Sequence, residues 1–231
     1  MVKYTGPRVK IIRRLGILPG LTRKIYKLRK KTPGEAGEDI RKLNNKRFTL
    51  KTDYKNCLLE KQKLRFNYGI TEKQLYTYYN LAKKSKHLTG IILLELLESR
   101  LDTVVFRLGY GQTISNARQL INHKHILINN KIISIPSFIC KPNDKISISV
   151  NTKLKELIIN SIVAKQLRQE LILKRMKQIK LVKSPIFGYF FLGDHLKLDK
   201  NIISGIFLFP PKHKDFLLKV DITKVLEYFT I

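Results

Sequence analysis

The feature that most constrains the fold of this chain is a change of hydrophobic period within residues 97–150. Up to Leu108 the apolar residues recur three and four positions apart, which gathers them on one face of a helix. A glycine-rich break at 109–111 follows, and from His125 onward apolar and polar residues alternate as on a half-buried strand. We therefore expect a compact unit in which two helices joined by a glycine turn lead into a β-hairpin.

The rest of the chain contains further helical and strand-like stretches. Residues 54–67 look helical and end before Gly69, and Thr71 with Gln74 predicts a capping box for the helix that follows. Asparagines at 129 and 130 tolerate the positive φ of a tight hairpin turn. We expect helices at 54–67, 89–108, 113 or 115 to 122, and 152–183, and a further helix after Thr71 that buries Leu75, Tyr78, Tyr79 and Ala82. We expect strands at 125–128, 131–135, 138–141 and 145–150. From Ile186 onward we expect short strands and turns.

The charge of the chain indicates its class of partner. There are 46 Lys and Arg residues against 17 Asp and Glu, a formal net charge of +29. Such an excess is typical of proteins that bind a dense polyanion and release its counterions. An anionic membrane is the alternative to nucleic acid, but the longest apolar runs, 90–94 and 202–211, fall far short of the roughly 20 residues of a spanning helix. Cys57 and Cys140 lack the spacing of a disulfide framework or a zinc site, so we expect a reducing compartment.

The first 34 residues contain no acidic residue and are interrupted repeatedly by Gly and Pro. These breaks exclude a long helix. A solvated tail or a transit peptide would also be basic and free of acids. Because aliphatic residues between Ile11 and Leu18 can anchor the segment, we favour an extended arm that follows RNA phosphates. Its candidate RNA contacts are Arg8, Arg13, Arg14 and Arg23.

Polar and basic residues also cluster where the helices of residues 97–150 meet the hairpin. A cationic face on rigid elements suits the shape-defined backbone of folded RNA better than base-edge readout in DNA. A single lysine here is more often a solvated surface charge, and His123 and His125 cap a helix end or a hairpin as often as they bind RNA. The cluster therefore carries more weight than its members. The candidate RNA contacts are Arg100, Arg107, Arg118, Gln119, His123, Lys124 and Lys131.

This unit resembles the S-four RNA-binding domain. The similarity lies in LESRLDTVVFRLG at 97–109, ARQLINHK at 117–124 and INNK at 128–131. The flanks resemble small-subunit ribosomal protein four, and LPGLT at 18–22 is similar to its plastid and cyanobacterial variety. The flanking stretches are MVKYTGPR at 1–8, RRLG at 13–16, EKQKLRFNYGITEKQ at 60–74 and LEYF at 226–229.

The resemblance implies an α+β fold: a helical body with an inserted αα-β-hairpin RNA-binding domain, a basic N-terminal arm and a short β-rich C-terminal tail. We expect the arm at 1–53, the helical body at 54–96, the S-four domain at 97–151, and a basic helix with the C-terminal part of the body at 152–231. By position in the matching stretch, Lys61, Lys63 and Arg65 join the candidate RNA contacts.

The implied function is that of a structural constituent of the small ribosomal subunit and not of an enzyme. Such a protein is a primary binder of the subunit's RNA, nucleates assembly of the body, and contributes to the messenger entry region and to translational accuracy. The implied partners are small-subunit ribosomal RNA, neighbouring small-subunit proteins and messenger RNA near the entry channel, with no membrane and no cofactor.

The chain also departs from the family pattern. Many bacterial members carry arm cysteines that bind zinc; none is present here, so no metal is predicted. Residues 33–37 lack the usual histidine of a family turn, and the basic helix at 152–183 is longer than the family norm. The resemblance begins at Met1, so we expect no cleaved presequence, and the abundance of Ile, Lys and Asn suits an organellar genome. We expect a plastid (chloroplast) ribosome, with a bacterial cytoplasm as the alternative.

Two other functions compete with this one. Pseudouridine synthases can carry the same binding domain, and Arg100-Leu101-Asp102 matches the residues around their catalytic aspartate. That aspartate needs a large catalytic domain around it, whereas here the tripeptide opens the binding domain itself. We therefore expect Asp102 to pair with a nearby cation. The second competitor, a free RNA chaperone for stalled subunits, would associate only loosely with ribosomes.

Overall fold

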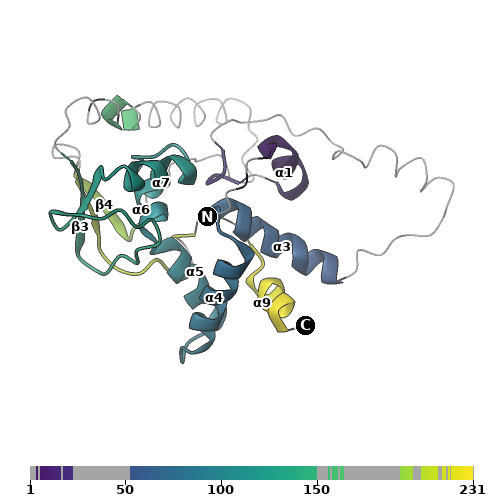
Figure 1. Ribbon diagram of the computed structural model, residues 1–231. Helices are drawn as coiled ribbons and strands as arrows, with labels where there is room; N and C mark the ends of the chain where they lie inside the picture. The colour runs from purple at the N-terminus through teal and green to yellow at the C-terminus, as the bar shows by residue number, and fades with distance from the viewer. Residues whose placement is uncertain are drawn as a thin grey trace, which may run out of the picture. The chain divides into compact units, whose positions relative to one another are not determined.

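The computed structural model (Figure 1) describes residues 4, 6–16, 18–22, 53–149, 156, 158–160, 162–163, 193–199, 204–212, 215–216, 218 and 220–230. The chain divides into two compact units. One consists of Met1–Gly90 with Leu218–Ile231, and the other of Ile91–Leu217. The two ends of the chain therefore belong to the same unit.

The first unit is helical, and α3 (Asp53–Tyr68) packs against α9 (Ile222–Thr230) from the far end of the sequence. Gly69, at a φ of 58°, follows α3 as predicted. The Thr71 hydroxyl accepts from the Gln74 amide while the Gln74 side chain accepts from the Thr71 amide, so the predicted capping box at the start of α4 (Glu72–Lys83) is confirmed. The predicted apolar stripe of α4 is also buried: Leu75, Tyr78, Tyr79 and Ala82.

Near the amino terminus the chain is helical, so the prediction of an extended arm is wrong for α1 (Arg8–Leu15). The helix forms because it buries its aliphatic side chains, a gain of about 1.5–3 kcal/mol for each. These side chains are Ile11, Ile12 and Leu15. Beyond the helix, the Gly20 amide donates to Asn67 Oδ1 at 3.0 Å, which ties this segment to α3. The predicted arm residues 23–52 lie outside the described part of the chain.

The second unit contains α5 (Thr89–Glu98), most of which belongs to it, α6 (Leu101–Arg107) and α7 (Ile114–Asn122). The prediction of one helix over 89–108 is wrong because the helix is interrupted at Ser99 and Arg100. Arg100 is extended, with φ −66° and ψ 141°, and forms an antiparallel bridge with Ile139. The Cys140 amide donates to the Ser99 carbonyl at 2.8 Å. The segment around Cys140 thus occupies a carbonyl that a continuous helix would use for its own hydrogen bonds.

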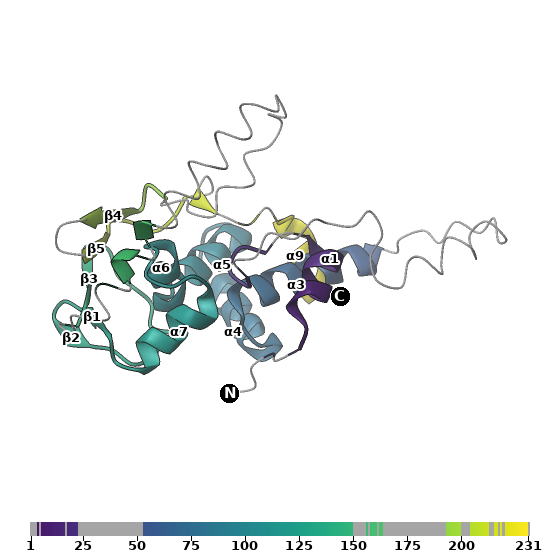
Figure 2. The same ribbon diagram turned by 90° about the horizontal axis from the view of Figure 1, so that it is seen from above.

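The sheet of the second unit is antiparallel and has the strand order β2-β1-β3-β5-β4 (Figure 2). Asn129 and Asn130 both have positive φ, at 49° and 65°, in the turn between β1 and β2. Figure 2 shows α6 and α7 on one side of this sheet. Gly205 permits close packing there, since a Cβ at this position would lie 2.5 Å from the Leu108 side chain. The strands are β1 (Ile126–Ile128), β2 (Lys131–Ile132), β3 (Asp144–Ile148), β4 (Leu196–Asp199) and β5 (Ser204–Phe207).

Two sequence predictions for this region need correction, and a third falls mostly outside the described residues. The strand expected at 138–141 is only the isolated bridge at Ile139, because Phe138 accepts from the Leu101 amide and Cys140 donates to the Ser99 carbonyl, and neither joins the sheet. The tail is not simply β-rich: β4 and β5 join the sheet beside β3, and the chain then ends in the helix α9. Most of the basic helix expected at 152–183 lies outside the described residues; those that are described there, 156, 158–160 and 162–163, are helical.

Candidate nucleic-acid interface

A buried carboxylate connects two of the predicted RNA-contacting arginines. Asp102 is fully buried. It accepts from Arg100 Nε at 3.0 Å and Arg100 NH2 at 2.9 Å, and from Arg118 Nε at 2.7 Å. Its Oδ1 also accepts from the Thr103 amide at the start of α6, where a carboxylate is favoured by the helix dipole. The cluster of Arg100, Asp102 and Arg118 has a formal net charge of one positive unit.

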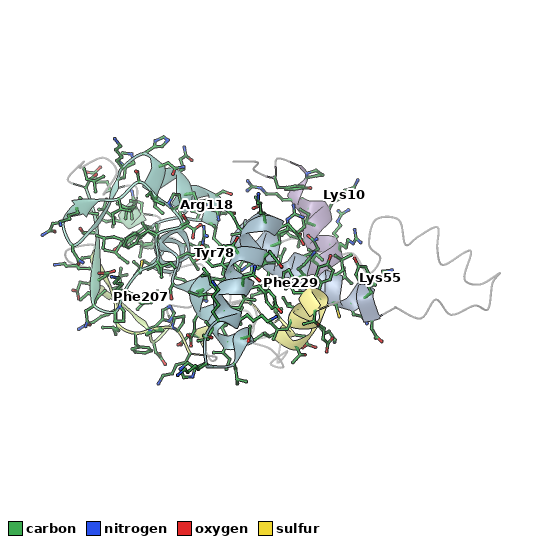
Figure 3. All side chains as sticks on the ribbon, turned by 60° about the horizontal axis from the view of Figure 1, so that its bottom comes forward. Lys10, Lys55, Tyr78, Arg118, Phe207 and Phe229 are labelled. Carbon is green, nitrogen blue, oxygen red and sulfur yellow. The ribbon has the colours of Figure 1, made fainter. Side chains whose placement is uncertain are left out.

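The two arginines of the cluster differ in their access to solvent. The side chain of Arg100 is 1% exposed, whereas that of Arg118 is 18% exposed. Arg118 projects from α7 (Figure 3). A phosphate can therefore approach the cluster only through Arg118, and the ion pair with Asp102 limits the rotamers that Arg118 can adopt. The predicted pairing of Asp102 with a nearby cation is confirmed.

A second buried ion pair holds Arg107. Its Nε and NH2 donate to the two Glu98 oxygens at 3.0 and 2.6 Å, and NH2 also donates to the Asp215 carbonyl at 3.0 Å. The buried His195 imidazole lies nearby, with Nδ1 3.7 Å from the Asp215 carboxylate. Burial, and then the Arg107 charge, lower the pKa of His195 below its ordinary value. This group of side chains is therefore part of the core of the second unit.

Lys61 is buried as well, in the first unit. It forms an ion pair with Glu72, and its Nζ lies 3.6 Å from the centre of the Tyr228 ring. Hydrogen bonds from Lys61 and then from Tyr54 lower the pKa of the Tyr228 phenol. The lysine thus links α3, α4 and α9.

The structure accordingly corrects the predicted RNA contacts at three positions. Arg100, Arg107 and Lys61 have relative exposures of 1%, 3% and 2%, and each is paired with a carboxylate. A side chain with so little exposed surface cannot lie against a phosphate, so we remove these three from the candidate interface. Their charges had suggested a surface position because isolated buried charges are rare, but each has an acidic partner.

The remaining candidates of the second unit lie where α7 meets the hairpin. Gln119, His123 and Lys124 are exposed at the end of α7, and Lys131 is exposed at the start of β2. Lys124 has a φ of 62°, and its amide donates to the Ile121 carbonyl, a turn that ends the helix. The rings of His123 and His125 lie 5.9 Å apart. Together with Arg118 these residues are what we call the α7–hairpin face: Arg118, Gln119, His123, Lys124, His125 and Lys131.

Two exposed lysines near this hairpin were missed at the level of sequence. Lys141 and Lys145 flank the turn before β3, and Asn143 in that turn has a φ of 69°. The turn is fixed to the hairpin, since Asn129 Nδ2 donates to Asp144 Oδ1 at 2.9 Å and the Lys145 amide donates to Asn129 Oδ1 at 3.0 Å. The pairing of β1 with β3 could have indicated that these lysines adjoin the predicted contacts.

The candidates of the first unit are dispersed over α1 and α3. Arg14 is exposed on α1, and Arg8 and Arg13 are half-buried there. Figure 3 shows Lys10, an exposed residue of the same helix that the prediction left out. Lys63 and Arg65 are half-buried on α3, which contacts α1. Arg23 lies outside the described residues.

Two kinds of site are absent from the described part of the chain. No helix in it is both long enough and apolar enough to cross a membrane. Nor does it bring three or more His, Cys, Asp or Glu side chains together in a way that could hold a metal ion.

Comparison with known proteins identifies the family. Residues 3–98 match the ribosomal protein S4/S9 N-terminal domain, and residues 99–146 match the S4 domain. A small ribosomal subunit protein uS4c from Trieres chinensis is 41% identical over 230 residues, which cover 100% of this chain and 99% of the relative. The chain belongs to the ribosomal protein S4 family.

Further members of the S4 family match a shorter part of the chain at higher identity. Proteins also named small ribosomal subunit protein uS4c, from Marchantia polymorpha and Cyanophora paradoxa, are each 51% identical to it. Those matches cover 70% and 68% of this chain, and 76% and 75% of the respective relatives.

The S4 domain match contains every residue of the α7–hairpin face. It ends within β3, whereas β4 and β5 lie far beyond it in sequence and still complete the same sheet.

The S4 family is not an enzyme family. The buried ion pairs of Asp102 agree with this, because they leave the carboxylate no surface from which to attack a base.

Proposed function

We propose that this chain is a structural constituent of the small subunit of a plastid ribosome and binds the RNA of that subunit directly. The observation that carries the proposal is its similarity, over its whole length, to a small ribosomal subunit protein uS4c. The same designation supports the plastid. The exposed basic residues of the α7–hairpin face and the net charge of +29 support RNA as the bound polymer.

The binding mechanism follows from the rigidity of the α7–hairpin face. Its cations stand on a helix end and on a hairpin whose turn is held by Asn129 and Asp144, so little backbone entropy is lost on binding. The guanidinium of Arg118 is held in place by the buried carboxylate of Asp102. Phosphate contacts of this kind recognise the shape of a folded RNA and carry no base sequence.

We also propose the finer roles that the family resemblance implies. The chain acts as a primary binder of the RNA and nucleates assembly of the subunit body beside neighbouring ribosomal proteins. It also contributes to the messenger entry region and to translational accuracy. No catalysis and no membrane partner are required for these roles.

The experiment that tests RNA binding compares Arg118→Ala with the intact protein on a folded fragment of small-subunit RNA over a range of salt concentrations. We expect weaker binding, and a slope of log affinity against log salt that is less steep by about 0.7–0.9 for each phosphate that the variant no longer neutralises. Circular dichroism is the control for folding. Lys55→Ala is the matched control, since it also removes one positive charge but lies at an exposed position of α3 that is not among the candidate contacts. An unchanged affinity and slope for folded Arg118→Ala would contradict the proposed face.

Two outcomes would replace the proposed function altogether. Uridine isomerisation by the purified protein would make it a pseudouridine synthase. Loss of the protein from small subunits during sedimentation in high salt would make it a free chaperone, because a structural constituent stays bound under those conditions.

A further inference from the structure

A chain of aromatic rings crosses three helices of the first unit and is not used by the α7–hairpin face. Tyr54 on α3 lies 5.6 Å from Tyr228 on α9, and Tyr228 lies 5.7 Å from its neighbour Phe229. Phe229 in turn stacks on Tyr79 of α4 at 4.8 Å and lies 6.0 Å from Tyr76. Figure 3 shows Phe229 on α9 beside the other helices of this unit. The two ends of this aromatic chain are therefore Tyr54 and Tyr76.

These end rings are open to solvent while the inner rings support them. Tyr54 and Tyr76 are each 51% exposed, whereas Tyr79 is buried. Tyr76 is held on one side by Tyr79, at 6.3 Å, and by Phe229. A ring that is fixed on one side and open on the other has a face available for another flat, apolar group.

The charges near Tyr76 are mostly positive. On α4, Lys73 precedes Tyr76 by three positions and Lys83 follows it by seven, so both lie on the same side of the helix, and both are exposed. The acidic residue beside them, Glu72, forms an ion pair with the buried Lys61. At the carboxyl end of α9, Glu227 accepts from the Cys57 thiol at 3.5 Å. Glu72 is therefore balanced by Lys61, and Glu227, two positions before Phe229, keeps its charge but lies on another side of α9. Lys73 and Lys83 add positive charge on the Tyr76 side of α4.

We propose that Tyr76 is a stacking platform for an unpaired base of single-stranded RNA, with Lys73 and Lys83 contacting the flanking phosphates. An exposed aromatic ring between lysines is the combination used to bind single strands without reading their sequence. A protein partner fits less well, because the centres of protein interfaces are depleted of lysine. This inference rests on the proposed RNA binding, but it places a second kind of RNA contact, with bases, on the other unit of the chain.

The experiment measures the affinity of the full chain for short oligoadenylate and for an abasic strand of the same length and charge. The intact protein should prefer the strand with bases. In Tyr76→Ala this preference should fall roughly 5- to 150-fold, the loss expected for one stacked base. Tyr76→Phe retains the ring and should retain the preference. Thr77→Ala, at the adjacent exposed position, should behave like the intact protein.

Each other outcome overturns the inference. No preference for bases in the intact protein, or an unchanged preference in Tyr76→Ala, would show that the ring does not stack on RNA. Loss of a neighbouring ribosomal protein from reconstituted subunits carrying Tyr76→Ala, with the preference intact, would make the face a protein contact. Binding of a folded RNA fragment that depends on Arg118 is measured in parallel. If the protein does not bind the folded fragment, the proposed RNA binding itself is contradicted, whereas a failure at Tyr76 alone contradicts only the stacking site.

Discussion

The buried pair of Glu98 and Arg107 offers the sharpest test of which arginines bind RNA and which support the fold. Glu98 is 1% exposed and Arg107 is 3% exposed, and the pair is bidentate. Arg107→Leu removes the guanidinium and leaves the Glu98 carboxylate buried. Removing one partner of such a pair costs about 3–5 kcal/mol, a large share of the roughly 5–15 kcal/mol that stabilises a typical protein. The double variant Glu98→Met with Arg107→Leu removes both charges at similar volume and should lie within about 1 kcal/mol of the intact protein.

The assay is urea unfolding followed by circular dichroism, at a salt concentration that screens the net charge. At a slope of about 1–3 kcal/mol per molar urea, the single variant should lower the unfolding midpoint by on the order of 1–5 M, and the double variant should restore it. RNA binding supplies the second measurement. The double variant should bind a folded RNA fragment like the intact protein, with the same dependence on salt.

Two results would refute this reasoning. If the double variant is as unstable as the single one, the hydrogen bond from Arg107 to the Asp215 carbonyl stabilises the core more than the charge pair does. If the double variant is stable but its salt slope falls by about 0.7–0.9, Arg107 contacts a phosphate, and our removal of this residue from the interface is wrong.

Further predictions concern the interface and the core. Arg118→Ala should weaken binding to folded RNA without unfolding the protein, as measured by a binding titration and circular dichroism side by side. Because the pKa of His195 is lowered in the folded protein, the unfolded chain binds a proton at a higher pH than the folded one. The free energy of unfolding should therefore fall as the pH drops below about 6.5, the ordinary pKa of histidine. Urea midpoints should show this fall, and His195→Phe should reduce it. Burial raises the pKa of Cys140 to about 12, so alkylation at pH 8 should be slow in the native protein and fast in urea; fast native alkylation would refute its burial. Gly205→Val should cost about 1–3 kcal/mol in thermal or urea unfolding, because the added atoms meet Leu108; a neutral result would mean that the packing adjusts.

Local features were predictable because their causes lie within a few residues of sequence. The capping box at Thr71, the glycine after α3 and the positive φ of Asn129 and Asn130 follow from backbone preferences that neighbouring side chains reinforce. The buried stripe of α4 follows from helical spacing. The family resemblance likewise rests on short stretches of residues.

The break between α5 and α6 could not be predicted in this way. Residues 89–108 have helical spacing throughout, yet the helix stops where Arg100 pairs with Ile139, a residue from beyond the hairpin. A pairing partner so far along the chain leaves no mark on local periodicity. For the same reason the joining of β4 and β5 to the sheet was missed.

The sequence alone determined that this chain is a basic α+β protein with an RNA-binding unit, since charge, periodicity and turn residues are properties of the chain itself. Only the tertiary structure decided which cations reach the surface. Arg100 and Arg118 are both arginines that the sequence places on helices, and both pair with the buried Asp102. Of the two, Arg118 has the side chain that reaches solvent. The physical reason is that a cation is stable either in water or against a buried carboxylate, and the position of that carboxylate is set by the packing of α6 against α7.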